Sequence, residues 1–225
     1  MRRQIRWKKW LIGITSLCIL VWMTWFFGYT YVRMVTQSKN LTKPTPSAQE
    51  QGLLNLSSLE FWTCQIGVFQ SEENALQEKK RLDQLGWEAQ ILSQNPWSVS
   101  IGFAHTQEEL ALIREHLKEG GIVSVSKNIK IPERAYRIRG TNAEQTARIL
   151  EAVHSFLNGS SSSKEQILSQ LEKELIIPGP KGLSKLQEAG LIVIKAERTL
   201  QEDMRKIVTL RLLAEYLGTL ETLKK

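Results

Sequence analysis

The residues of this chain that are best suited to bind a ligand directly are small, polar and uncharged. Thr63 and Gln65 alternate with apolar residues in one segment, and Ser98 and Ser100 do so in a second segment. Hydroxyl and amide groups both donate and accept hydrogen bonds without carrying a charge. A sheet face made of such residues would suit an uncharged ligand that is rich in hydroxyl groups, and the alternative is an ordinary solvated outer face.

The sequence has no arrangement of residues that is typical of an enzyme or of a metal site. It contains no phosphate-binding glycine loop, nucleophile elbow, HExxH motif or dinucleotide-binding loop. The acidic pairs at 72–73 and 108–109 fall in the first turns of expected helices, where carboxylates interact favourably with the helix dipole. The three histidines show no ligand spacing, and Cys18 and Cys64 are not expected to pair. We expect a binding protein without catalytic residues, metal or cofactor.

The candidate residues belong to a tandem repeat. An offset of 35 residues aligns the two copies, so that Trp62 matches Trp97 and Gly67 matches Gly102. The residue pattern of each copy predicts a strand, a helix and a second strand. Ser71 is expected to cap the helix of the first copy, and Thr106 that of the second. The predicted elements are 61–69, 71–85 and 88–93 in the first copy, and 97–104, 106–119 and 122–126 in the second. Together they predict a βαββαβ domain over residues 59–133, in which two helices cover one face of a four-stranded antiparallel sheet.

Strand alternation assigns the residues of the predicted strands to two faces of this sheet. The face toward the helices is expected to hold the apolar residues Trp62, Cys64, Ile66, Val68, Trp97, Val99 and Ile101. The other face, which we call the polar face, is expected to be open to solvent. Its expected members are Thr63, Gln65, Gly67, Ser98, Ser100, Gly102, Ser124 and Ser126.

Residues 61–126 resemble the SPOR (sporulation-related repeat) domain, a module that binds peptidoglycan. The first copy has the pattern aromatic-x-x-Gln-x-Gly-x-Phe, and the second copy has aromatic-x-Val-x-x-Gly. The residues that match are Trp62, Gln65, Gly67 and Phe69, then Glu73, Asn74, Ala75 and Gly86, and finally Trp97, Val99 and Gly102. The resemblance implies a ligand made of glycan strands that have lost their stem peptides, bound on the open sheet face. It also implies that Thr63, Gln65, Ser98 and Ser100 lie in or near the binding groove.

The N-terminus has the properties of a membrane anchor. No charged residue occurs from Trp10 to Val32, and about 22 apolar residues in a helix match the thickness of a bilayer core. Five Lys and Arg residues precede this segment, and aromatic residues lie toward both of its ends. The positive-inside rule predicts a single-pass protein of the cell membrane, with residues 1–9 in the cytoplasm and the later domains outside the cytoplasm. No small-x-small motif indicates cleavage of a signal peptide.

Two further regions surround the repeat. Residues 33–58 are polar, contain Pro44 and Pro46, and predict a linker. In residues 134–225, the segment 134–140 is expected to add an edge strand, and helical patterns follow. The expected helices are 142–157, 165–176, 183–189 and 199–217. We expect this region to form a small helical bundle or hairpin that contacts another protein, or a purely structural addition.

The distribution of charge argues against a nucleic-acid partner. The formal net charge is +7, but residues 1–43 hold eight basic residues and no acid, so the rest of the chain carries −1. Residues 59–133 carry −4 and residues 134–225 carry +4, which predicts a weak mutual attraction. An RNA-recognition domain has the same element order but needs aromatic residues on its open face, where this chain has polar ones. We predict a wall-binding protein of bacterial cell division or sporulation, with a membrane-tethered protein scaffold as the alternative.

Overall fold

The computed structural model describes residues 51–140, 142–159 and 164–223, all within one compact unit. The predicted cytoplasmic head, the predicted membrane helix and residues 33–50 of the predicted linker lie outside these ranges. Within them, no helix combines the length and the apolar character needed to cross a membrane. The described residues have an α+β fold, as predicted.

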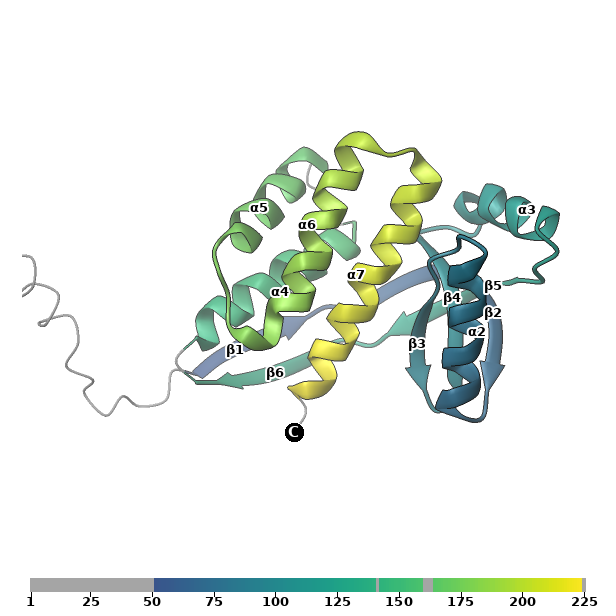
Figure 1. Ribbon diagram of the computed structural model, residues 1–225. Helices are drawn as coiled ribbons and strands as arrows, with labels where there is room; N and C mark the ends of the chain where they lie inside the picture. The colour runs from purple at the N-terminus through teal and green to yellow at the C-terminus, as the bar shows by residue number, and fades with distance from the viewer. Residues whose placement is uncertain (1–50, 141, 160–163, 224–225) are drawn as a thin grey trace, which may run out of the picture. The chain divides into compact units, whose positions relative to one another are not determined.

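The tandem repeat forms the predicted βαββαβ unit (Figure 1). Its sheet has the order β3-β4-β2-β5, and every pair of neighbouring strands is antiparallel. The elements are β2 (Leu59–Phe69), α2 (Glu72–Gln84), β3 (Gln90–Gln94), β4 (Trp97–Ala104), the short 3₁₀ helix η1 (Glu108–Leu110), α3 (Ala111–Glu119) and β5 (Val125–Ile131). The last strand begins three residues later than predicted, because Gly121 and Ile122 still close the end of α3 through bonds to Lys118 and Leu117.

Local signals explain the helix starts. The Ser71 side chain accepts a hydrogen bond from the Asn74 backbone N–H at 3.3 Å and thereby caps α2. The Thr106 hydroxyl accepts one from the Glu109 N–H, and the Glu109 carboxylate accepts one from the His105 N–H. Both predicted capping residues are therefore used, although the second helix opens with a 3₁₀ turn.

Two expectations about the flanking segments are wrong. Residues 51–56, which were expected to belong to the linker, form β1 (Gln51–Leu56). The segment expected to add an edge strand to the main sheet forms β6 (Arg134–Arg139) and pairs with β1 in a separate two-stranded sheet. The physical reason is burial: Leu54, Tyr136 and Ile138 join the core of the helical region rather than the edge of the repeat domain.

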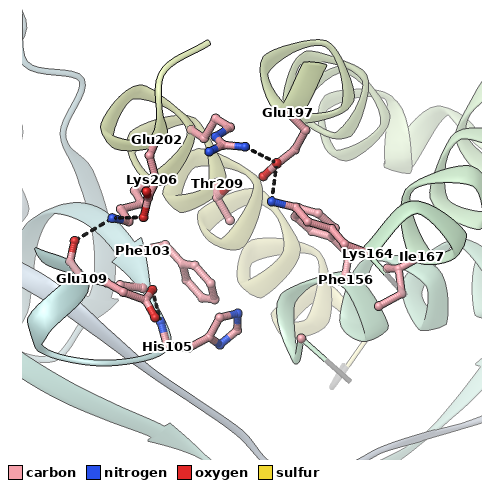
Figure 2. A pocket seen from close by; sticks show the side chains of 13 residues that line it. Phe103, His105, Glu109, Phe156, Lys164, Ile167, Glu197, Glu202, Lys206 and Thr209 are labelled. Atoms are coloured by element: carbon pink, nitrogen blue, oxygen red, sulfur yellow. Dashed lines mark hydrogen bonds and ion pairs between the residues drawn. The ribbon is translucent and has the colours of Figure 1, made fainter. Parts of the chain in front are cut away.

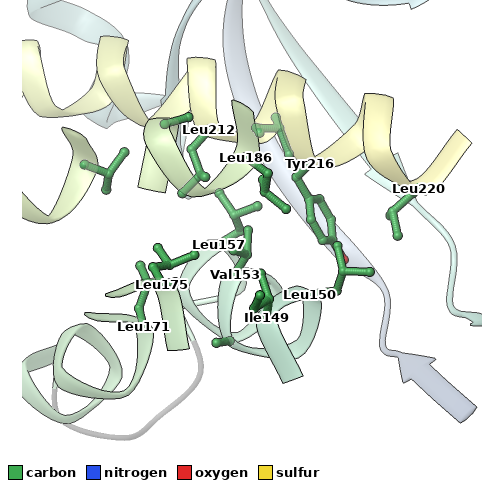
Figure 3. Packing of buried hydrophobic residues seen from close by; sticks show 14 of the residues in the cluster. Ile149, Leu150, Val153, Leu157, Leu171, Leu175, Leu186, Leu212, Tyr216 and Leu220 are labelled. Carbon is green, nitrogen blue, oxygen red and sulfur yellow. The ribbon is translucent and has the colours of Figure 1, made fainter. Parts of the chain in front are cut away.

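In the described residues of the C-terminal region, four α-helices pack around one core. They are α4 (Ala143–Leu157), α5 (Lys164–Ile176), α6 (Ser184–Thr199), which follows the 3₁₀ helix η2 (Lys181–Leu183), and α7 (Glu202–Thr222). The predicted helices are present, but α6 is much longer than the expected segment 183–189. The buried side chains that join them include Ile149, Leu150, Val153, Leu157, Leu171, Leu175, Leu186, Leu212 and Tyr216 (Figure 3).

A buried polar chain links three parts of this core. The two ring nitrogens of His154 on α4 lie 2.9 Å from the Tyr216 hydroxyl on α7 and 3.0 Å from the Ser57 hydroxyl in the β1–β2 connection. Burial lowers the pKa of His154, because the charged imidazolium loses its hydration. Burial also raises the pKa of Tyr216. The neutral forms of both side chains are therefore favoured in the folded protein.

Candidate functional site

The four candidate residues share one face of the sheet. The β2–β5 pairing is uninterrupted along the first half of β2, so Thr63 and Gln65 point to the same side. Ser100 lies opposite Gln65, and Gln65 Nε2 donates a hydrogen bond to Ser98 Oγ at 2.7 Å. The Thr63 hydroxyl donates to the carbonyl of Ile101 at 3.3 Å. The structure therefore brings Gln65, Ser98 and Ser100 together, with Thr63 beside them.

A bulge in β2 makes part of the face assignment wrong. The register between β2 and β4 shifts at Ile66, which is the additional residue. Beyond the bulge, Gly67 lies opposite Val99 and faces the helices, whereas Val68 lies opposite Ser98 on the polar face. Val68 is consequently half exposed rather than part of the core. Strict alternation cannot anticipate an inserted residue, so both assignments were reversed.

Three other residues expected on the polar face lie elsewhere. Gly102 has φ +75°, and a Cβ built on it would lie 2.9 Å from Ile113 Cδ1, so this position faces α3. Ser126 lies opposite Cys64 and therefore faces the helices. Ser124 precedes β5 and is not part of the sheet. The polar face is thus smaller than the sequence indicated.

The polar face is also largely covered, contrary to the prediction that it is open. Thr63 and Ser100 are fully buried and Ser98 is 6% exposed, whereas Gln65 is half buried. Every residue of β4 after Trp97 is buried, whichever side it faces. The hydroxyl of Ser100 has no hydrogen-bond partner within the described part of the chain. A sheet face that is covered by protein needs apolar side chains beside its polar ones. The strands β2 and β4 each provide one.

Phe61 and Phe103 form this apolar surface. Their rings stack at a centroid distance of 5.3 Å, and both side chains, with Leu59, belong to the core cluster of the helical region. The sequence pattern was not used to assign these two phenylalanines to the polar face. For Phe61 the signal was present, because this residue stands two residues before Thr63 and therefore has the same parity. Phe103 has the opposite parity to Ser98 and Ser100, and the register shift between β2 and β4 near Thr63 was not visible in the sequence.

Comparison with known proteins identifies the repeat. Residues 58–126, or 69 of the 225 residues, match the family model of the SPOR domain. This segment is a SPOR domain. SPOR domains are binding modules rather than catalytic ones; they bind peptidoglycan and are generally linked to cell division. No curated protein and no solved structure matches the chain.

The helix α7 covers the polar face of the SPOR domain. It contacts β4 and the edge strand β3, whereas α2 packs against the same sheet through Ala75 and Leu82 on the other side. At the start of α7, the Lys206 ammonium donates a hydrogen bond to the Glu109 carbonyl oxygen at 2.7 Å (Figure 2). One turn later, the Arg211 guanidinium lies 3.7 Å from the Glu88 carboxylate. These contacts attach α7 to the connection between β4 and α3 and to the connection between α2 and β3.

A pocket of about 340 Å³ lies where α7 meets the SPOR domain (Figure 2). Phe103 and His105 line it from the SPOR domain, and Thr209 lines it from α7. Its charges are paired: Glu197 lies 2.7 Å from Lys164 and 3.2 Å from Arg205, and Lys206 lies 2.7 Å from Glu202. The hydrogen bond from Lys206 lowers the pKa of Glu202. The Glu109 carboxylate, which also lines the pocket, accepts hydrogen bonds from the His105 N–H and the Thr106 hydroxyl.

Part of the polar face stays accessible on β2 and β5. Gln65 is half buried there, and its neighbours Val68 and Val125 are half exposed or more. On the opposite side of the sheet, burial raises the pKa of the Cys64 thiol to about 11, so this cysteine is a core residue rather than a nucleophile. No group of His, Cys, Asp and Glu side chains in the described ranges is arranged to hold a metal ion. The accessible chemistry of the face is that of amide, hydroxyl and small apolar groups.

Proposed function

We propose that this chain is a single-pass membrane protein that binds the glycan strands of peptidoglycan outside the cytoplasm, in cell division or sporulation. The observation that carries the proposal is the SPOR match at residues 58–126, on a segment that folds as the expected four-stranded unit. The uncharged run from Trp10 to Val32 and the basic residues before it support the membrane anchor and its orientation.

Gln65 is the residue that we assign to glycan recognition in the accessible part of the face. One Nε2 hydrogen of its amide is donated to Ser98, and the second hydrogen and the carbonyl oxygen are left as a donor and an acceptor for sugar hydroxyl and acetamido groups. The bond to Ser98 holds the amide in place, which reduces the entropy that is lost when a ligand binds. Ser98 and Ser100 on β4 extend the same surface beneath α7, and Thr63 is buried beside them on β2.

Sedimentation of the full-length chain with purified wall sacculi tests the proposal. Neutral hydrogen bonds contribute about 0.5–1.5 kcal/mol each, so Gln65→Ala should weaken binding roughly threefold to tenfold. Gln77→Ala is the matched control, because Gln77 is an exposed amide on α2 and belongs to the opposite side of the sheet. Equal sedimentation of Gln65→Ala, Gln77→Ala and the unchanged chain would exclude Gln65 from the binding site.

A membrane-tethered scaffold is the second candidate function. It is favoured by the burial of Thr63, Ser98 and Ser100 beneath α7, because a covered sheet face supports packing rather than ligand binding. A chain that does not sediment with sacculi, but retains a cooperative unfolding transition, would support the scaffold.

The proposed orientation has a separate test. Protease added to intact protoplasts should remove the domains that follow residue 33 and leave the N-terminal segment protected. Digestion of the N-terminus with protection of the later domains would reverse the orientation.

A further inference from the structure

The helix α7 is buried on more sides than packing within the helical region requires. A surface helix that packs on one neighbour buries a single apolar stripe. In α7, Ile207, Val208, Thr209 and Leu210 are buried in succession, and Leu212 and Leu213 follow after the half-buried Arg211. Ile207 belongs to the core cluster of the SPOR domain, whereas Leu210 and Leu213 belong to the cluster of the helical region. The helix is therefore shared between two cores.

Charge complementarity accompanies this packing. Lys206 reaches from α7 to the Glu109 carbonyl of the SPOR domain, and Arg211 lies 3.7 Å both from the Glu88 carboxylate of the SPOR domain and from the Glu188 carboxylate of α6. The Lys206 side chain is only 11% exposed, so its bond to Glu109 is protected from water. The opposite net charges of residues 59–133 and 134–225 act in the same direction.

The residues hidden by α7 are chemically better suited to a polar ligand than to a helix. A buried hydroxyl without a partner is destabilising, and Ser100 Oγ is such a group. Ser98 and Thr63 satisfy their hydroxyls only within the sheet, through Gln65 and the Ile101 carbonyl. Each of these hydroxyls gains a possible partner when the face is exposed to water or to a sugar.

From these observations we infer that α7 is an intramolecular cover on the glycan-binding face of the SPOR domain, and that the structure shows the closed state. The inference rests on the proposed function. In the closed state only the part of the face around Gln65 is available, and release of α7 adds the surface of Thr63, Ser98 and Ser100. The apparent affinity for glycan then depends on the fraction of molecules in which α7 is released.

Weakening the attachment of α7 tests this inference. In the full-length chain, Lys206→Met removes the bond to Glu109, together with the ion pairs to Glu202 and Asp203 inside α7, but keeps the approximate length of the side chain. Arg198→Met is the matched control, because it breaks an ion pair with Glu172 between α6 and α5, away from the SPOR domain. Loss of a charged hydrogen bond should raise sacculus binding roughly tenfold or more in Lys206→Met. Faster amide exchange in α7 should accompany it, and Arg198→Met should change neither quantity.

A second pair of variants covers the case in which Lys206→Met does not fold. Glu88→Lys places a positive charge opposite Arg211 and should also raise binding. Arg211 also lies 3.7 Å from Glu188 of α6, so both variants carry Glu188→Gln; adding Arg211→Glu should then restore the opposite charges at positions 88 and 211 and return binding toward that of the Glu188→Gln chain.

The possible results separate this inference from the proposed function. If α7 exchanges faster in Lys206→Met while the unchanged chain and the variant bind sacculi equally, α7 is not a cover, although glycan binding stands. If no variant binds sacculi even though α7 exchanges faster, the proposed glycan function itself is overturned.

Discussion

At the scale of single residues, Thr63 and Ser100 show how burial changes the meaning of a polar side chain. Both are fully buried on the same sheet face, but only Thr63 has a hydrogen-bond partner, the carbonyl of Ile101. A satisfied buried hydroxyl contributes to stability, whereas an unsatisfied one carries a desolvation cost without compensation. The two residues therefore have opposite energetic roles in the closed state.

This difference gives a matched pair of predictions. Ser100→Ala removes an unpartnered hydroxyl and should leave the free energy of unfolding unchanged or raise it by up to about 1 kcal/mol. Thr63→Val removes a partnered hydroxyl of nearly the same volume and should lower it by about 1 kcal/mol. Urea unfolding of both variants measures the two changes. A larger loss for Ser100→Ala than for Thr63→Val would show that Ser100 has a partner in solution.

At the scale of elements, the helices α5 and α6 meet at a glycine. A Cβ built on Gly190 of α6 would overlap Leu175 Cδ1 of α5, and Leu175 is itself buried. Gly218 of α7 is also helical, but a Cβ there would meet no atom within 4 Å. The glycine at 190 therefore allows close packing of two helices, whereas the glycine at 218 lowers only the intrinsic helix propensity.

The same substitution should therefore have opposite effects at the two positions. Gly218→Ala should stabilise the protein by about 0.5–1 kcal/mol, since alanine is the better helix former. Gly190→Ala gains the same propensity but must displace Leu175, and overpacking typically costs about 1–3 kcal/mol. Thermal melting should show a higher Tm for Gly218→Ala and a lower Tm for Gly190→Ala. Equal stabilisation by both changes would contradict the close approach of α5 and α6.

At the scale of the whole molecule, the SPOR domain and the helical region are joined through a continuous set of contacts. Phe61 and Phe103 of the SPOR sheet belong to the core of the helices, and the His154 ring connects Ser57 with Tyr216. Burying a large apolar side chain contributes about 1.5–3 kcal/mol, so exposing these two phenylalanines is costly. Release of α7 is consequently a minor state of the isolated chain, unless a ligand or partner stabilises it.

The burial of His154 predicts a specific pH dependence of stability. Its pKa is lowered in the folded state, so below about pH 6.5 the unfolded chain binds a proton more readily than the folded chain does. The contribution of this residue is complete above that pH and is lost as the pH falls toward the folded-state pKa. The free energy of unfolding should therefore decrease between pH 7.5 and 5.5.

The variant His154→Gln isolates this contribution from those of the other histidines. It should lower stability at pH 7.5, because it disturbs the bonds to Ser57 and Tyr216. It should also show a smaller decrease toward pH 5.5 than the unchanged chain, as measured by urea unfolding at both values. An identical pH dependence in the two proteins would show that His154 titrates normally.

The local sequence determined the helices and strands of the SPOR domain and which of their polar residues share a sheet face. The 35-residue repeat, the caps at Ser71 and Thr106 and the alternation in β2 and β4 predicted a four-stranded sheet with Thr63, Gln65, Ser98 and Ser100 on one face. These features depend on neighbours that are close in the chain or related by strand pairing. They remain valid whatever covers the sheet.

Only the tertiary structure decided which of these surfaces meets solvent. The bulge at Ile66 depends on how β2 pairs with β4, and it exchanges the faces of Gly67 and Val68. The pairing of β1 with β6 and the position of α7 on β4 and β3 join segments that are distant in the sequence. The alternation of residues in a strand shows that one face of the sheet is polar. Whether that face is buried depends on how much apolar area the rest of the chain can pack against it. Here Phe61 and Phe103 supply that area beside the polar residues, and they join the same core cluster as residues of α7.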